Sequence, residues 1–195
     1  MHRPLMIVVA GPPGSGKTAA FPTGSFGVDG FNIDDRCAQI VGSYRALSRT
    51  VRRAVAAECE RFIHEHIDSG RSFAVETTLR TVTPIEQAEK ARDRGFATHL
   101  RFIATDSVEE NIARVLQRAQ AGGHAASERD IRQIYDDSIR NLARAAAVFA
   151  TVRVYDSTAR WELPRLIAIK RHGTLEVVGD SPTWLERAPL ALTPR

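Results

Sequence analysis

One short segment, the glycine-rich run from Gly11 to Thr18, constrains the fold of this chain more than any other. Its letters GPPGSGKT fit the pattern G-x-x-x-x-G-K-[ST], in which backbone N–H groups cradle phosphate oxygens. The run follows Leu5–Ala10, a continuous apolar segment typical of a strand buried on both faces of a parallel sheet. A helix can begin after Thr18, although Pro22 ends it early. The sequence therefore predicts a strand, a phosphate-binding loop and a short helix.

The loop assigns a role to each of its functional residues. Gly14 and Gly16 allow the backbone to turn so that successive N–H groups point inward at phosphate. Lys17 is expected to reach the β- and γ-phosphates, and the Thr18 hydroxyl is placed to bind Mg²⁺. We therefore expect ATP or GTP, with Mg²⁺, to bind the residues Gly11, Pro12, Pro13, Gly14, Ser15, Gly16, Lys17 and Thr18.

Strand-like and helix-like apolar patterns alternate along most of the chain. Further strands are expected at residues 31–33, 72–76, 97–104 and 151–155, and helices at 49–67, 84–94, 108–119 and 128–149. This alternation favours an α/β fold, here a P-loop NTPase of the kinase-like, three-layer type with a largely parallel central sheet. Two apolar segments around residues 171–173 predict a C-terminal β-hairpin at about 164–180. We expect residues 1–195 to form a single domain.

Carboxylates follow two of the expected strands, at the edge where ligands of parallel sheets bind. Asp34 is a candidate base for an acceptor hydroxyl, and Asp35 is a weaker candidate for the same role. Alternatively, either residue could cap a helix at 36–40. Glu76, followed by Thr77, could bind the acceptor or a metal-bound water. The alternative for Glu76 is a strand-end carboxylate that faces solvent.

Arginines mark a second candidate region at about residues 107–135. Arg114 and Arg118 lie four residues apart, so they share one helix face, and Arg132 lies on the next helix. Two helices joined at Gly122-Gly123 would make a lid over the phosphates, and lid arginines can neutralise the charge of a transferring phosphoryl group. The alternative is a solvated helix face. His124 at the glycine break could contact phosphate or pack in the turn.

Composition excludes several other classes of protein. The net charge of +4, from 27 basic and 23 acidic residues, is too mild and dispersed to indicate a nucleic-acid partner. No apolar run approaches the length that crosses a bilayer, so we expect no membrane partner and a cytoplasmic location. Cys37 and Cys59 are expected to be reduced, buried thiols. His64 and His66 point to different helix faces, and no zinc site is expected.

Taken together and in order, the motifs resemble those of the zeta-toxin-like kinase family. The matching segments are GPPGSGKT, FNIDDR, AVETTLR, DSVEENIARVLQRAQAGGH and RVYDST, and they span roughly residues 5–180. The resemblance implies an ATP- or GTP-dependent kinase, and well-known members of the family phosphorylate the 3′-hydroxyl of UDP-N-acetylglucosamine. It implies catalytic roles for Lys17, Asp34, Arg118 and Arg132, and acceptor binding at Glu76. It also makes an antitoxin protein a candidate partner.

Two other functions stay open at this point. The segment that holds the sugar nucleotide in classical members is not identifiable here, so the acceptor could be a different small metabolite. A nucleotide-dependent switch or partner-binding protein is the third interpretation, although the chain lacks the base-reading N-K-x-D motif of switch GTPases.

Overall fold

The chain folds around one mixed sheet. The computed structural model describes residues 3–42, 48–120, 126–160, 162–171, 173–188 and 192–193. In this part of the chain the strand order is β2-β3-β1-β4-β5-β6-β7-β8. The strands are β1 (Leu5–Ala10), β2 (Asp29–Phe31), β3 (Phe73–Thr77), β4 (Ala97–Ala104), β5 (Thr151–Asp156), β6 (Arg165–Arg171), β7 (Thr174–Val177) and β8 (Leu192–Thr193).

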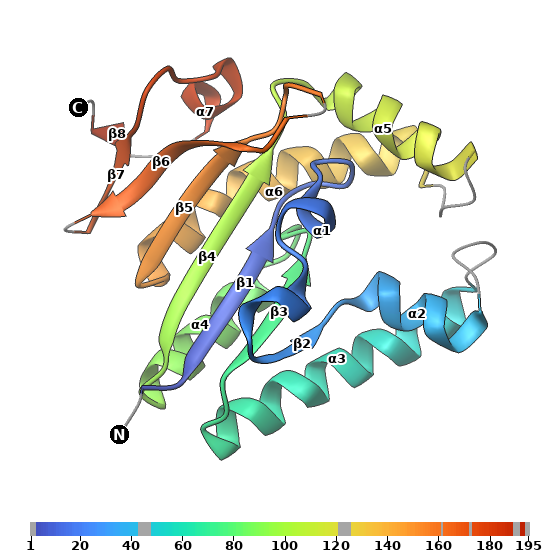
Figure 1. Ribbon diagram of the computed structural model, residues 1–195, viewed down its shortest axis with the longest axis vertical. Helices are drawn as coiled ribbons and strands as arrows, with labels where there is room; N and C mark the ends of the chain where they lie inside the picture. Colours follow the sequence, from blue (N-terminus) through green and yellow to red (C-terminus); the bar gives the residue numbers. More distant parts are fainter. Residues whose placement is uncertain are drawn as a thin grey trace.

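The first five strands in the chain pair in parallel, which confirms the predicted α/β fold with a largely parallel sheet. Strand β6 then runs antiparallel to both β5 and β7, which confirms the C-terminal hairpin. The carboxyl ends of β1, β2 and β3 therefore meet at one edge of the sheet, where the predicted loop and both predicted carboxylate segments begin (Figure 1).

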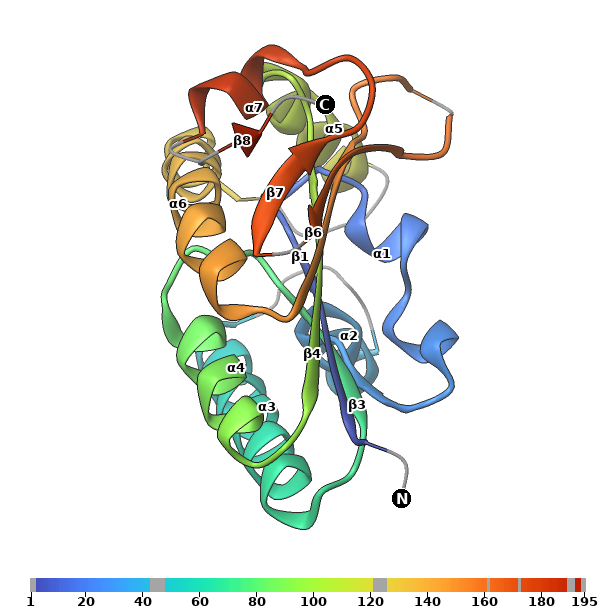
Figure 2. The ribbon, with the colours of Figure 1, turned by 90° about the vertical axis from the view of Figure 1, so that its left-hand side faces the viewer.

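The helices form two layers of unequal thickness. The described helices are α1 (Lys17–Ala20), α2 (Ile33–Val41), α3 (Arg49–Ser69), α4 (Thr83–Asp93), α5 (Val108–Gln120), α6 (Glu128–Val148) and α7 (Thr183–Arg187), with a 3₁₀ turn, η1 (Thr23–Phe26). Figure 2 shows the sheet almost edge-on, with α3, α4 and α6 on one face and α1 and η1 on the other. The thin second layer follows from the break at Pro22.

The main core lies between the sheet and the thick helical layer. Strand β1 is buried along nearly its whole length, as the continuous apolar run predicts. Helix α3 contributes Val55, Cys59, Ile63 and Ile67, which recur every four residues and so share one face. Cys37 is also buried, and both cysteines are free thiols, as expected.

Helix α2 begins earlier than the sequence predicts. The strand before it ends at Phe31, and Asn32 is the N-cap. The Asn32 Oδ1 accepts hydrogen bonds from the backbone N–H groups of Asp34, at 2.9 Å, and Asp35, at 3.3 Å. The prediction that Asp34 or Asp35 could cap this helix is therefore wrong. Asn32 takes that role, which leaves both carboxylate groups out of the cap.

Other differences lie on the surface and near the C-terminus. Leu116 on α5 is 49% exposed, although it is apolar. The elements η1, α7 and β8 were not predicted. Trp184 of α7 is buried, and its indole N–H donates to Asp156 Oδ1 at 3.2 Å. The glycine pair at 122–123, His124 and Trp161 lie outside the described residues.

None of the helices in the described residues has both the length and the apolar character needed to cross a bilayer.

Candidate active site

Three glycines of the loop have backbone conformations that residues with a side chain rarely adopt. Gly11, Gly14 and Gly16 have φ angles of 144°, 80° and 81°. A Cβ atom on Gly11 would lie 2.0 Å from the carbonyl oxygen of Ile103, and one on Gly14 would lie 2.5 Å from that of Asn111. The loop is thus packed against β4 and α5 so closely that only glycine fits at Gly11 and Gly14.

Lys17 lies in the loop rather than in solvent. Only 7% of the surface of Lys17 is exposed, and its Nζ donates a hydrogen bond to the carbonyl oxygen of Pro12 at 3.0 Å. Burial lowers the pKa of Lys17, whereas the nearby carboxylates of Glu76 and Asp34 act in the opposite direction. The ammonium group therefore sits in a desolvated position where an anion would stabilise its charged form.

Ser15 gives an independent indication that the loop fits an anion. Its residue is fully buried, and its Oγ has no hydrogen-bond partner within the described chain. Buried hydroxyl groups are usually hydrogen-bonded, so a buried hydroxyl without a partner indicates that a ligand or a water molecule binds there. A phosphate group held in this loop would supply an acceptor for it.

Thr18 and Glu76 meet across the edge of the sheet. The Thr18 hydroxyl donates to Glu76 Oε2 at 2.8 Å, and the Asn32 side-chain amide donates to the same oxygen at 3.0 Å. Burial raises the pKa of Glu76, and Lys17 and the Thr18 hydrogen bond partly oppose that effect. The alternative of a carboxylate simply facing solvent is wrong, because Glu76 lies half-buried in this contact.

This pair of oxygen ligands is suited to Mg²⁺. Magnesium is bound in nucleotide sites by one or two protein oxygens together with substrate phosphates and water, so no all-protein cage is needed. The described residues contain no cluster of three or more histidine, cysteine, aspartate or glutamate side chains that could hold a metal. The predicted metal ligand, Thr18, thus lies beside the carboxylate of Glu76, a contact that the sequence analysis did not predict.

Asp34 lies at the same edge and is half-exposed, with 48% of its side chain accessible. Arg52 of α3 donates from Nη2 to Asp34 Oδ1 at 3.2 Å. The Arg52 Nε is buried and has no hydrogen-bond partner among the described residues. Asp34 also acts on the charge of Lys17, so the two predicted catalytic residues are within electrostatic reach of each other.

The segment after β3 is held in a strained conformation. Leu79 is fully buried and has a φ of 56°, which is unusual for a residue other than glycine. Asn141 of α6 donates to the carbonyl oxygen of Leu79 at 3.0 Å, and Ser138 of α6 donates to that of Thr78. The predicted substrate residue Thr77 accepts from the Leu79 N–H at 3.2 Å, so α6 fixes the segment that presents it.

The three arginines predicted in the lid have different surroundings. Arg118 is exposed on α5, and its charge contributes to lowering the pKa of Lys17. Arg132 forms ion pairs with Glu109 and Glu128, each at 2.7 Å. The structure therefore brings Arg118 towards the loop but shows Arg132 engaged with carboxylates of α5 and α6.

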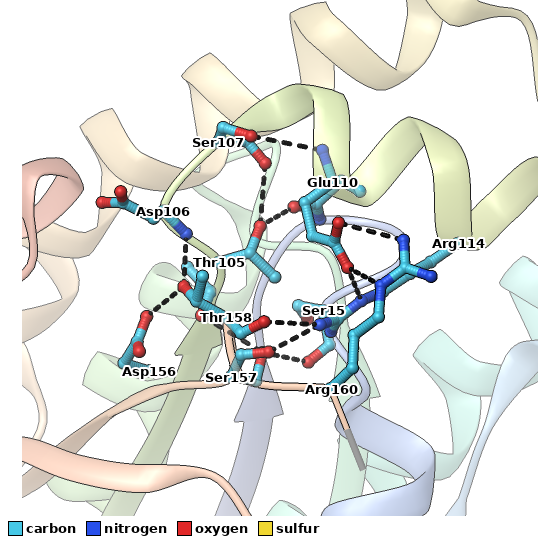
Figure 3. A network of polar contacts seen from close by, with 12 residues as sticks. Ser15, Thr105, Asp106, Ser107, Glu110, Arg114, Asp156, Ser157, Thr158 and Arg160 are labelled. Carbon is cyan, nitrogen blue, oxygen red and sulfur yellow. Dashed lines mark hydrogen bonds and ion pairs between the residues drawn. The ribbon is translucent and has the colours of Figure 1, made fainter. Parts of the chain in front are cut away.

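The third arginine, Arg114, belongs to a polar network that joins α5 to the segment after β5 (Figure 3). It donates to Glu110 Oε1 at 2.8 Å and to the carbonyl oxygen of Ser157 at 2.8 Å. Arg160 binds both carboxylate oxygens of Glu110, at 2.8 and 3.1 Å, and these arginines hold the pKa of Glu110 below its ordinary value. Ser157 in turn donates to the carbonyl oxygen of Ser15 at 2.8 Å.

Asn111, which sequence reasoning missed, anchors the loop from the other side. It is fully buried, accepts a hydrogen bond from the Thr105 hydroxyl and donates one to the carbonyl oxygen of Pro13. Its own carbonyl oxygen is the atom that a side chain at Gly14 would strike. A buried amide at this position has no periodic sequence signal that separates it from an ordinary helix residue.

A cavity of about 300 Å³ opens beside the loop. Its walls come from Ser15 and Gly16, from α1, from Arg114 and Gln117 of α5, and from the segment after β5. Apolar side chains line part of it, including Ala19, Leu163 and Pro164. A partly apolar cavity next to a phosphate loop has the character of a site for a nucleotide base.

The chain is similar in sequence to known proteins. A sequence model of the Zeta toxin family matches residues 38–172. An uncharacterized protein of Haemophilus influenzae is 34% identical over 73 residues, which cover 37% of this chain and 49% of that protein. The chain thus aligns with about half the length of this curated relative.

Solved structures share the fold. A chain from the PezAT chromosomal toxin–antitoxin system of Streptococcus pneumoniae superimposes with a TM-score of 0.64 at 18% identity, covering 96% of this chain and 79% of that chain. A chain of the AvrRxo1-ORF1:ORF2 complex gives 0.71 at 18% identity, with coverage of 95% and 63%. The AvrRxo1 complex with ATP gives 0.68 at 16% identity, with coverage of 90% and 60%. At these identities the likeness establishes the fold.

Proposed function

Because this chain belongs to the zeta toxin family, we propose that it is a nucleotide-dependent phosphotransferase that phosphorylates a hydroxyl group of a small molecule. The observation that carries the proposal is the meeting of Lys17, Thr18, Glu76 and Asp34 at one edge of the parallel sheet. Phosphoryl transfer needs a phosphate cradle, a metal ligand and a base near the acceptor. Lys17 belongs to the phosphate cradle, Thr18 with Glu76 beside it is the metal ligand, and Asp34 is the base.

The nucleotide is ATP or GTP in this proposal. Its terminal phosphates occupy the loop from Gly11 to Thr18, with the Lys17 ammonium and the Ser15 hydroxyl in reach, and its base enters the cavity lined by Ala19 and Leu163. Bound Mg²⁺ supplies positive charge that neutralises the phosphates. Thr18, with Glu76 beside it, is the protein group that would hold the metal.

Asp34 is the proposed base for the acceptor. Its carboxylate takes the proton of the acceptor hydroxyl while the hydroxyl oxygen bonds to the terminal phosphorus and the nucleoside diphosphate leaves. Arg52 donates a hydrogen bond to Asp34 Oδ1 at 3.2 Å and so helps to orient the carboxylate. Glu76 and Thr77 line the acceptor side of the same edge.

We propose that residues 1–195 form one kinase domain whose lid spans about 107–135. Arg118 on this lid neutralises charge on the transferring phosphoryl group, since its side chain is exposed and its charge already reaches Lys17. Arg132 would join it only after leaving Glu109 and Glu128. Lid closure on nucleotide would provide that rearrangement.

The acceptor proposed first is a nucleotide sugar such as UDP-N-acetylglucosamine, because the chain belongs to the zeta toxin family. A different small metabolite is the second candidate, since the acceptor side is formed by short segments around Asp34 and Thr77 that would suit many hydroxyl compounds. The partner proposed is an antitoxin protein, by analogy with the toxin–antitoxin system that shares the fold.

Mass spectrometry of a metabolite extract tests the proposed reaction. The extract is incubated with enzyme, Mg²⁺ and ATP or GTP, and compared with the same mixture containing Asp34→Asn. We expect one compound to gain a phosphate group with the parent enzyme and to stay unchanged with the variant. Nucleotide hydrolysis without any phosphorylated metabolite would contradict the proposal and favour a switch protein.

A further inference from the structure

Strands β4 and β5 lie in the middle of the sheet, yet they are covered on one face only. Along β4 the residues 97, 99 and 101 are half-buried and alternate with buried ones, and residues 151, 153 and 155 do the same along β5. A parallel strand packed on both faces is instead buried almost continuously, as β1 is. The alternation indicates that no helix covers the second face of β4 and β5 within the described chain, although Phe21 packs against Tyr155 and Arg101 there and Phe26 packs against Arg101.

The figures agree with this burial pattern. Figure 1 looks onto this face and shows β4 and β5 with helices α4 and α6 behind them. Figure 2, turned by 90°, shows α3, α4 and α6 to the left of the sheet and α1 and η1 to its right. Because α1 ends at Ala20, before Pro22, no long helix extends from the loop across β4 and β5.

This exposed face, which we call the β4–β5 face, carries cationic residues side by side. Arg101 on β4 is the register partner of Arg153 on β5, and His99 is the partner of Thr151. Like charges on directly adjacent strand positions repel and so cost stability. The repulsion between the two arginines would be offset by a ligand that carries negative charge.

Arg101 and Arg153 form no ion pair with the described residues. The Arg101 guanidinium lies between two aromatic rings, 4.6 Å from the centroid of Phe21 and 4.8 Å from that of Phe26. Arg153 and His99 make no hydrogen bond or ion pair with any described residue. The carboxylate on the same face of the hairpin, Glu176, pairs with Arg171 at 3.7 Å.

The electrostatic consequence is visible at His99. Burial lowers the pKa of His99, and the charges of Arg153, Arg101 and Arg3 lower it further. No nearby carboxylate contributes in the opposite direction. The β4–β5 face therefore holds a positive potential that a negatively charged ligand would relieve.

The β4–β5 face also contains a hollow that is partly lined by apolar side chains. A hollow of about 90 Å³ is lined by Leu5 and Ile7 of β1 together with His99, Arg101 and Arg153. Apolar side chains beside cations suit an amphipathic partner rather than a fully hydrated ion. The hollow is distinct from the phosphate loop, because it shares no residue with the cavity beside Ser15.

We propose that the β4–β5 face is the docking surface for an acidic amphipathic α-helix of a partner protein. The three strands β1, β4 and β5 span roughly 10 Å across the sheet, which matches the diameter of a helix. Carboxylates one helical turn apart are about 5–6 Å from each other, close to the roughly 7 Å between residues 99 and 101 along β4. The partner helix supplies the layer that usually covers such a face.

A second copy of this chain fits less well, since two β4–β5 faces would bring four arginines together. A small anion could relieve the charge but would leave the half-buried side chain of Leu5 uncovered. Charge complementarity together with the apolar lining thus favours the acidic helix.

Peptide binding tests the proposal. The probe is a synthetic, fluorescently labelled amphipathic helix with glutamates one turn apart beside leucines, and its counterpart has glutamine in their place. By fluorescence anisotropy we expect the acidic peptide to bind about tenfold more tightly than the counterpart, and more weakly as NaCl rises. Arg153→Glu should weaken binding by about tenfold.

Matched variants make the result specific. Arg144→Glu alters an exposed arginine on α6, on the opposite side of the sheet, and should leave peptide affinity unchanged. Arg153→Gln serves if the glutamate variant does not fold, as judged by circular dichroism. Lys17→Met should bind the peptide as the parent does, which separates this surface from the phosphate loop.

Several results would overturn the proposal. These are equal affinity for both peptides, no loss of affinity in Arg153→Gln, displacement of the peptide by inorganic phosphate alone, or self-association of the parent protein that Arg153→Glu abolishes. The last two outcomes would assign the face to a small anion or to a second copy of the chain.

Discussion

The hydroxyl of Thr18 donates a hydrogen bond of 2.8 Å to Oε2 of Glu76, although the two residues lie 58 positions apart in the chain. The parallel pairing of β1 with β3 brings them together, because Glu76 lies near the carboxyl end of β3 and Thr18 lies on α1, where the loop that follows β1 ends. The contact joins the phosphate loop to the predicted acceptor side. It makes Glu76 the natural place to test the electrostatics of the site.

Glu76→Gln should stabilise the folded protein at neutral pH. Burial raises the folded-state pKa of Glu76, so its ionised form is penalised in the fold. This loss of folding free energy is absent below the ordinary carboxyl pKa. It grows as pH rises from that value to the folded-state pKa and is constant above it. Urea unfolding from acidic to neutral pH should therefore show the advantage of the variant increasing with pH. The exposed Glu60→Gln should show no such trend, and an advantage of Glu76→Gln that shrinks as pH rises would contradict this account.

Asp34→Asn should abolish phosphoryl transfer while nucleotide binding persists. The amide cannot accept the acceptor's proton, and general base catalysis contributes about 10²–10⁴-fold to rate. Single-turnover transfer and nucleotide affinity should be measured separately. Asp35→Asn, one residue further along α2, is the control and should retain transfer. Full activity in Asp34→Asn would show that another group is the base.

Arg118→Ala should slow transfer by about 10²–10³-fold, the usual cost of removing one donor that stabilises transition-state charge. Arg118 is exposed, so the substitution should leave the melting temperature nearly unchanged. Steady-state kinetics should place most of the loss in kcat rather than in KM. The exposed Arg129→Ala on α6 should leave kcat unchanged, and equal effects from both variants would refute a specific role for Arg118.

Asn111→Ala should weaken both the fold and nucleotide binding. It leaves the carbonyl oxygen of Pro13 without its side-chain donor, which costs about 1–3 kcal/mol for an unsatisfied buried group. The Thr105 hydroxyl loses one acceptor but can still donate to the carbonyl oxygen of Ser107 at 2.9 Å. Thermal unfolding and nucleotide calorimetry measure the two effects. Gln117→Ala, on the exposed side of α5, should change the melting temperature little. A variant of Asn111 with normal nucleotide affinity would show that the loop holds its shape without this anchor.

The sequence predicted the phosphate loop well because its signal is local. Glycine, lysine and threonine at fixed spacing between a strand and a helix leave few other conformations. The parallel sheet was also predictable, since apolar strands alternate with helices. The start of α2 was not, because Asn32, Asp34 and Asp35 are all acceptable caps by residue type, and only the backbone decides among them.

The supporting residues could not be found from the sequence. Asn111 and Pro13 are 98 positions apart, and Ser157 and Ser15 are 142 apart, so their contacts depend on the whole sheet being assembled. The uncovered β4–β5 face is similar. Arginine at alternate strand positions is visible in the sequence, but whether a helix covers that face depends on the tertiary structure.

Calorimetry of Mg²⁺-ATP and Mg²⁺-GTP binding tests the central claim most directly, with the parent protein compared with Lys17→Met. We expect saturable binding of at least one nucleotide to the parent, and affinity lower by tenfold or more in the variant, about 1.4 kcal/mol. The variant should fold as well as the parent, since burial disfavours the charge that it removes. No binding heat with the folded parent, or equal affinities for the two proteins, would contradict the account.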